Sequence, residues 1–108
     1  MSRKKGNIAE KQAQDYLTKN GFKIIQTNFY TQYGEIDIIA TKDNIYHFIE
    51  VKSGKNFEPL LNVTPKKLQK IIHSVSIYLA KNELDVLYCI DVITIKNNTI
   101  EFFSNVSM

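Results

Sequence analysis

Two apolar segments joined by a short polar turn constrain the fold of this chain more than any other feature. The first reads Gly34-Glu35-Ile36-Asp37-Ile38-Ile39-Ala40, and the second reads Phe48-Ile49-Glu50-Val51-Lys52. Both are rich in β-branched residues, which favour strands. The intervening Asp43-Asn44 tolerates positive φ, so the sequence predicts a β-hairpin in which Lys42 pairs with Ile45.

The predicted register gathers four charged side chains on one face of this hairpin. Counting back from the turn places Asp37 opposite Glu50. The next pair on the same face is Glu35 opposite Lys52. Opposed carboxylates have Cβ atoms about 5 Å apart. They repel each other unless a cation, a proton or a lysine relieves the repulsion. The hairpin therefore predicts a charged cluster that requires one of these three partners.

Strand alternation also predicts the surroundings of this cluster. Ile36 and Ile38 are expected together on the face opposite Asp37. Ile39 and Phe48 are expected on the same face as the carboxylates. We therefore interpret the carboxylate face as half core and half site.

The composition is typical of one folded domain spanning residues 1–108. The chain is 44% hydrophobic and 23% charged, which argues against global disorder. Its net charge of +3 permits a nucleic-acid partner without requiring one. The single cysteine, Cys89, suits a reducing compartment. No stretch approaches the roughly 20 apolar residues of a membrane span, and no signal peptide is recognisable. We therefore expect a cytoplasmic protein with no membrane partner.

The remaining pattern predicts the element order α-β-β-β-α-β-β. Outside the hairpin, the expected elements are a helix from about Lys5 to Asn20, a strand Phe22–Tyr30, a helix from Thr64-Pro65 to about Lys81, and strands Val86–Lys96 and Thr99–Phe103. This order predicts an α/β fold, a mixed four- to five-stranded central sheet flanked by two helices.

Two acidic residues outside the hairpin have ambiguous settings. Glu10 lies at the edge of the apolar stripe of the first helix, next to Ala13 and Leu17. It is either a solvated helix glutamate or a carboxylate that reaches a site on the sheet. Asp91 interrupts an apolar run, and a buried aspartate needs a partner that the sequence does not identify.

Three lysines, Lys66, Lys67 and Lys70, lie near the start of the second helix. Lysines four residues apart repel by a few tenths of a kcal/mol, and the positive end of the helix dipole disfavours them further. The same features attract a phosphate backbone. The alternative interpretation is a solvated basic face.

The chemistry of the hairpin cluster also leaves two interpretations open. Carboxylates without His or Cys favour a hard cation such as Mg²⁺ or Mn²⁺, which assists phosphodiester hydrolysis, and Lys52 could orient the attacking water. Alternatively, Glu35 and Lys52 form a plain cross-strand ion pair, and Asp37 and Glu50 lie at a solvated sheet edge.

Asp37 followed by Glu50-Val51-Lys52 resembles the D…(E/Q)xK signature of restriction-endonuclease-like nucleases, a group that includes archaeal Holliday-junction resolvases. More closely, the chain resembles the bacterial YraN-like family, for which an endonuclease activity has been proposed. The matching segments run almost end to end: Gly6-x-x-Ala9-Glu10, Tyr16-Leu17, Gly21, Asn28-Phe29, Gly34 to Ala40, Phe48 to Lys52, Val63-Thr64-Pro65-x-Lys67 and Asp91-Val92.

This resemblance implies a restriction-endonuclease-like fold and a role for each site residue. It implies Asp37 and Glu50 as ligands of Mg²⁺ or Mn²⁺, Lys52 at the nucleophilic water, and Glu10 as a helix-borne acid that completes the site. Glu35 lies opposite Lys52 in the predicted register and is therefore assigned a supporting role. Lys67 or Gln69 corresponds to a polar helix residue beside the site. The phosphate contacts are assigned to Lys55, Lys66, Lys67 and Lys70, with the Arg3-Lys4-Lys5 arm.

The resulting hypothesis is a Mg²⁺- or Mn²⁺-dependent DNA endonuclease, acting on branched or recombination and repair intermediates. A homodimer would fit the resemblance, because junction-resolving relatives pair two active sites. The alternatives are a nucleic-acid-binding module without turnover and a protein-interaction domain.

Overall fold

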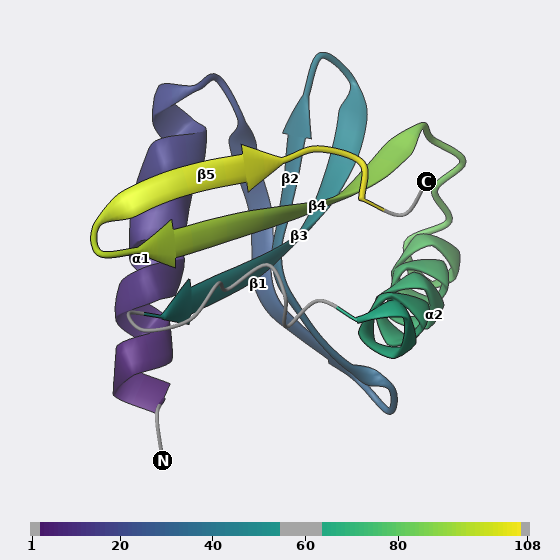
Figure 1. The fold of residues 1–108 in the computed structure, drawn as a ribbon. Coiled ribbons are helices and arrows are strands. Elements are labelled where there is room, and N and C mark those ends of the chain that lie inside the picture. The colour runs from purple at the N-terminus through teal and green to yellow at the C-terminus, as the bar shows by residue number, and fades with distance from the viewer. Residues whose placement is uncertain (1–2, 55–63, 107–108) are drawn as a thin grey trace.

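The structure is a computed structural model that describes residues 3–54 and 64–106. It contains α1 (Arg3–Lys19), β1 (Lys23–Thr31), β2 (Gly34–Lys42), β3 (Ile45–Gly54), α2 (Pro65–Lys81), β4 (Tyr88–Lys96) and β5 (Thr99–Phe103). The predicted order α-β-β-β-α-β-β and the α/β class are confirmed (Figure 1).

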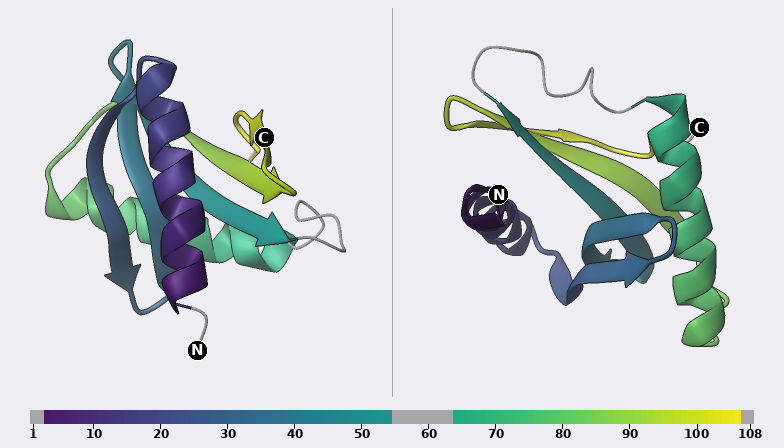
Figure 2. Two further views of the ribbon diagram at one scale, coloured as in Figure 1. Left: turned by 90° about the vertical axis from the view of Figure 1, so that its left-hand side faces the viewer. Right: turned by 90° about the horizontal axis from the view of Figure 1, so that it is seen from below.

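The five strands form one mixed sheet in the order β1-β2-β3-β4-β5. The first three strands form an antiparallel meander, β3 and β4 are parallel, and β5 returns antiparallel to β4. Since parallel neighbours need a crossover, α2 lies between β3 and β4 in the chain. The two helices cover opposite faces of the sheet (Figure 2).

The face under α1 is packed by two alanines and a leucine of the helix. Ala9, Ala13 and Leu17 recur at helical spacing and are buried against the sheet. The small side chains of the two alanines allow close approach of the helix. The sheet residues in this cluster are Ile38, Ala40, Ile49, Ile93 and Ile95. This packing places Glu10, the neighbour of Ala9, at the rim of the core.

The face under α2 carries larger side chains. Ile71, Val75 and Tyr78 are buried in a cluster whose other members are Phe29, Ile36, Ile39, Phe48 and Ile90. The predicted helix start is confirmed, because the Thr64 side chain accepts a hydrogen bond from the Lys67 amide (3.2 Å) and Pro65 occupies the first turn.

The β2–β3 hairpin has the predicted register. Asp43 and Asn44 form the turn with φ of 52° and 66°, and Lys42 pairs with Ile45. The ladder runs as far as the pair Ile38–Ile49. Beyond this pair the strands separate, and the Val51 amide donates instead to Asp37 Oδ2 (2.8 Å). We call the opening beyond Ile38 and Ile49 the fork.

The prediction that Ile36 and Ile38 share a face is wrong. Ile36 lies in the α2 cluster, whereas Ile38 lies in the α1 cluster. The change of face occurs at the fork, where β2 no longer pairs with β3 but still pairs with β1, through Thr27–Ile38 and Phe29–Ile36. On the other side of β2, Asn28 of β1 has a left-handed φ of 54°, and such irregularities increase local strand twist.

The alternation predicted for β3 holds on both faces. Ile49 and Val51 pack in the α1 cluster, and Tyr46 and Phe48 pack in the α2 cluster. The fourth strand begins at Tyr88 rather than at the predicted Val86. Neither helix of the described residues is long and apolar enough to cross a membrane.

Candidate active site

Three carboxylates converge at the fork from two elements. Glu10 comes from α1, and Glu35 and Asp37 come from β2. One oxygen of each lies within 4.8 Å of the others. Asp37 is 8% exposed, and the other two are half-buried. Glu10 therefore lies against the sheet and is not a freely solvated helix residue.

Asn28 holds two of these carboxylates together. Its side-chain amide donates to Glu10 Oε1 (3.0 Å) and to Glu35 Oε2 (2.6 Å). An amide nitrogen carries two hydrogens and can satisfy both acceptors. Sequence reasoning did not select Asn28 as a site residue. Its tolerance of left-handed backbone and its paired donors are the properties that this position uses.

Asp37 has a strongly raised pKa. Burial, and then the nearby Glu50 carboxylate, raise the pKa of Asp37 from 3.8 to about 9, although the Val51 amide hydrogen bond opposes the shift. The Glu50 carboxylate lies close enough to Asp37 to contribute to this shift, although the β2–β3 ladder ends before the two residues. Without a cation, Asp37 therefore holds a proton at neutral pH.

The ion pairing at the fork differs from the cross-strand alternative. The Lys52 ammonium lies 3.3 Å from Glu50 Oε2, on its own strand. Glu35 instead accepts from Asn28. The register predicted Glu35 opposite Lys52, but the ladder ends at Ile38 and does not hold these residues in register. Glu35 therefore belongs to the carboxylate group, beyond the supporting role assigned to it.

A hollow of about 260 Å³ opens beside these groups. Its lining residues are Tyr33, Gly34, Glu35, Glu50, Lys52, Lys67, Lys70, Ile71 and Ser74. Two acids from the strands thus line the same hollow as two lysines from α2. The carboxylate oxygens could bind a cation, and the lysine ammonium groups could bind an anionic group of the same ligand.

The structure separates the predicted nucleic-acid contacts into groups. Lys66, Lys67 and Lys70 are all exposed; Lys67 and Lys70 line the hollow, whereas Lys66 is not among its lining residues. Gln69 is also exposed, and its amide lies 3.5 Å from His73 Nε2. Lys55 lies outside the described residues. The proposed arm Arg3-Lys4-Lys5 begins α1.

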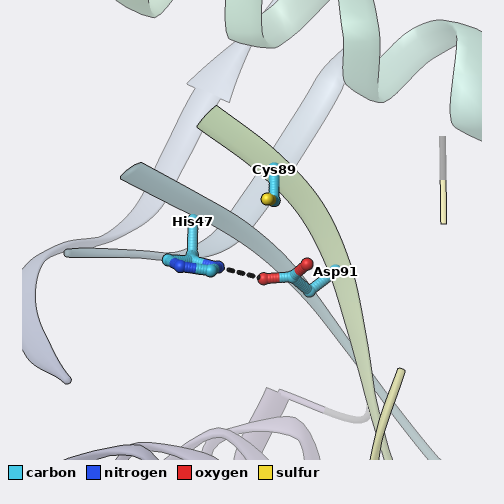
Figure 3. Close-up of side chains that lie close together, drawn as sticks. All are labelled: His47, Cys89 and Asp91. Carbon is cyan, nitrogen blue, oxygen red and sulfur yellow. Dashed lines mark hydrogen bonds and ion pairs between the residues drawn. The ribbon is translucent and has the colours of Figure 1, made fainter. Parts of the chain in front are cut away.

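Asp91 has partners that the sequence did not identify. It is fully buried, and its Oδ2 lies 2.6 Å from His47 Nδ1, while its Oδ1 accepts from the Asn105 amide (2.7 Å). Figure 3 shows His47 and Asp91 facing each other from β3 and β4, with Cys89 beside them. These contacts attach the segment after β5 to β4. We interpret Asp91 as a structural residue.

Comparison with known proteins places these residues in a family. Residues 9–95 match the uncharacterised protein family UPF0102. A UPF0102 protein from Aliarcobacter butzleri is 49% identical over the full length of both chains. One from Helicobacter hepaticus is 47% identical, over 99% of this chain and 97% of the relative, and one from Wolinella succinogenes is 45% identical over the full length of both.

The matched region contains all four residues assigned to catalysis: Glu10, Asp37, Glu50 and Lys52. The relatives' names state no activity. The similarity extends over nearly the whole chain and agrees with the resemblance noted in the sequence. The chain therefore belongs to the UPF0102 family, the YraN family.

Proposed function

We propose that this protein is a metal-dependent endonuclease that hydrolyses DNA phosphodiester bonds. The observation that carries this proposal is the convergence of Glu10, Glu35 and Asp37 within 4.8 Å, beside a hollow lined by lysines. Clustered carboxylates cost free energy unless they bind something positive. Lysines across the same hollow favour a negatively charged substrate.

The donor set fits a hard divalent cation. All three groups are carboxylates, which suit Mg²⁺ or Mn²⁺. The raised pKa of Asp37 supports the fit, because a proton now occupies a position that a cation could take. Glu10, Glu35 and Asp37 would hold the ion, and Glu50 adjoins them. A bound ion would act as a Lewis acid toward the scissile phosphate.

The other residues of the hollow have separable roles. Lys52 lies against Glu50 and could donate a hydrogen bond to the attacking water or to a phosphate oxygen. Lys67 and Lys70 would bind the flanking phosphates from α2. Asn28 holds Glu10 and Glu35 in place before any ligand arrives, and preorganisation of this kind lowers the cost of binding.

The lysine-lined hollow also supports a second candidate, a nucleic-acid-binding module of the same fold without turnover. Under either candidate the partner is DNA, and the cytoplasmic location and a homodimer remain predictions. Branched recombination or repair intermediates are the proposed substrates. Light scattering of the purified chain would measure the oligomeric state.

The test is a cleavage assay on branched, nicked and linear DNA with Mg²⁺ or Mn²⁺. Asp37→Ala and Lys52→Ala are expected to reduce the cleavage rate at least about 100-fold. Lys11→Ala is a matched control, because this lysine is 80% exposed on α1 and pairs with Asp15. Cleavage that is indifferent to both site substitutions would overturn the proposal. Salt-sensitive DNA binding without cleavage would favour the second candidate.

A further inference from the structure

Tyr33 gives the hollow an aromatic wall. It lies at the tip of the β1–β2 hairpin, beside Gly34 and Glu35, and it is 38% exposed. Its ring stacks on His73 of α2, with centroids 4.7 Å apart and an interplanar angle of 24°. Figure 2 shows this hairpin lying against α2. An aromatic surface thus stands next to the carboxylates and lysines of the candidate site.

The hairpin tip is fixed by polar contacts. Thr31 Oγ1 lies 2.7 Å from the hydroxyl of the buried Ser74 on α2. The same Thr31 oxygen accepts from the Tyr33 amide (3.0 Å) and contacts the Gly34 carbonyl (3.2 Å). Gly34 has a φ of +134°, which L side chains rarely adopt. Tyr33 is therefore held in place before a ligand binds.

A nucleobase is a ligand that can stack on the Tyr33 ring. Bases stack on exposed aromatic side chains of proteins that bind single strands, and this stacking is tolerant of sequence. Inside a duplex each base is already stacked and paired, so it must be unpaired or flipped out to reach a protein ring. The hollow of about 260 Å³ lies beside Tyr33. A base that stacks on Tyr33 there is therefore one that has left the duplex stack.

We propose that Tyr33 stacks on an unpaired base adjoining the scissile phosphate, so that the preferred DNA has single-stranded nucleotides at the cleavage position. Flapped DNA, DNA with splayed single-stranded arms, and single strands belong to this class, and continuous duplex does not. This inference rests on the proposed function, because the phosphate is placed by the same site. Lys67 and Lys70 contribute the backbone contacts that accompany the stacked base.

The test measures binding separately from cleavage. The full chain is titrated, with Ca²⁺ in place of Mg²⁺, into a flapped duplex and a blunt duplex of the same sequence. The flap carries 2-aminopurine, a fluorescent base whose emission falls on stacking, at its first unpaired position. The wild-type chain is expected to quench this emission and to bind the flap about tenfold more tightly than the blunt duplex.

The variants separate stacking from folding. Tyr33→Phe is expected to keep the quenching and the preference, whereas Tyr33→Leu and Tyr33→Ala lose both. Tyr88→Ala is the matched control, because this exposed tyrosine of β4 is not among the lining residues. Thermal melting of each variant checks that the fold is intact.

The outcomes distinguish this inference from the proposed function. Equal binding of both DNAs, with no change on Tyr33→Leu, contradicts the stacked base and leaves the nuclease proposal standing. No binding of either DNA by the wild-type chain, together with no cleavage under Mg²⁺ or Mn²⁺, contradicts both.

Discussion

At the scale of single residues, Asp37 combines burial, a second carboxylate and a backbone hydrogen bond. The first two factors raise its pKa to about 9, which means that the folded protein favours the protonated acid. Folding therefore holds this residue in a form that is uncommon for aspartate at neutral pH. A residue that only stabilised the fold would be better served by an amide of the same shape.

This comparison predicts the pH dependence of Asp37→Asn. Because the folded pKa lies above the unfolded value of about 3.9, the folded state binds more protons between about pH 4 and pH 9. The stability contributed by this group is present below pH 4 and is lost as the pH rises towards 9. Asp37→Asn should therefore raise the free energy of unfolding by about 1–3 kcal/mol at pH 8, and less at pH 5.

Urea denaturation at several pH values, without divalent cations, would measure this difference. Asp15→Asn on α1 is the control, because the Asp15 side chain is 62% exposed. A gain from Asp37→Asn that is constant between pH 5 and pH 8 would show that the acid is not titrating as described.

Asn28 gives a second prediction at this scale. Asn28→Gly preserves the left-handed backbone and removes the amide that holds Glu10 and Glu35. Because residues that support a metal site contribute about 10- to 100-fold in affinity, we expect Mn²⁺ binding to weaken by that factor. Isothermal titration calorimetry measures it.

A matched variant tests whether donation is the cause. Asn28→Asp keeps the shape but replaces the donor by a further negative charge, and it should disturb the two glutamates more than glycine does. Mn²⁺ affinity that is unaffected by Asn28→Gly would mean that Glu10 and Glu35 are positioned by their own elements.

At the scale of elements, the β2–β3 turn is under conformational strain that its residues tolerate. Asp43 and Asn44 both have positive φ. Asn44→Ala should lower the free energy of unfolding by about 1 kcal/mol, since the left-handed region is less favourable for alanine than for asparagine. Asn44→Gly should not lower it. Guanidinium denaturation measures both, and equal stabilities for alanine and asparagine would contradict the turn geometry.

The start of α2 allows a prediction about charge. Lys67 and Lys70 line the hollow, and Lys66 does not. If DNA phosphates bind in the hollow, Lys67→Ala and Lys70→Ala should each reduce the slope of log affinity against log salt by about one. Lys66→Ala should leave the slope nearly unchanged. Fluorescence anisotropy at several salt concentrations measures these slopes. An equal effect of the three lysine substitutions would indicate non-specific electrostatic attraction to DNA instead of binding in the hollow.

Sequence patterns predicted the elements wherever local rules decide them. The turn at Asp43-Asn44 and the helix start at Thr64 follow from side-chain preferences that act over a few residues. The two faces of β3 follow from alternation. The prediction for Ile36 failed because regular alternation breaks between Ile36 and Ile38, where β3 no longer pairs with β2 and Asn28 of the neighbouring β1 has a positive φ.

The site was predictable in its acids and not in its contacts. The hairpin register, which the sequence predicts, brings Asp37 near Glu50. The role of Asn28 depends on its unusual φ and on the approach of α1, and neither has a local signal. Likewise, the pairing of His47 with Asp91 depends on the parallel register of β3 and β4. These strands are far apart in the chain, and local sequence patterns do not specify their register.

At the scale of the whole molecule, the fork joins the two faces of the sheet. Glu10 approaches from the α1 side, while Lys67 and Lys70 approach from the α2 side. A complete β2–β3 ladder would separate these groups by a layer of backbone. The early end of the ladder therefore allows both helices to contribute to one site.

The contact between Thr31 and Ser74 has a consequence for how the molecule opens. It joins the hairpin tip to the middle of a helix that follows β3 in the chain, so neither can detach without breaking it. Amide hydrogen exchange should therefore report the tip and α2 as one cooperative unit with similar protection. Replacing Ser74 with alanine would weaken this coupling, leaving the Tyr33–His73 stacking, and the amides of the tip would then exchange faster than those of α2.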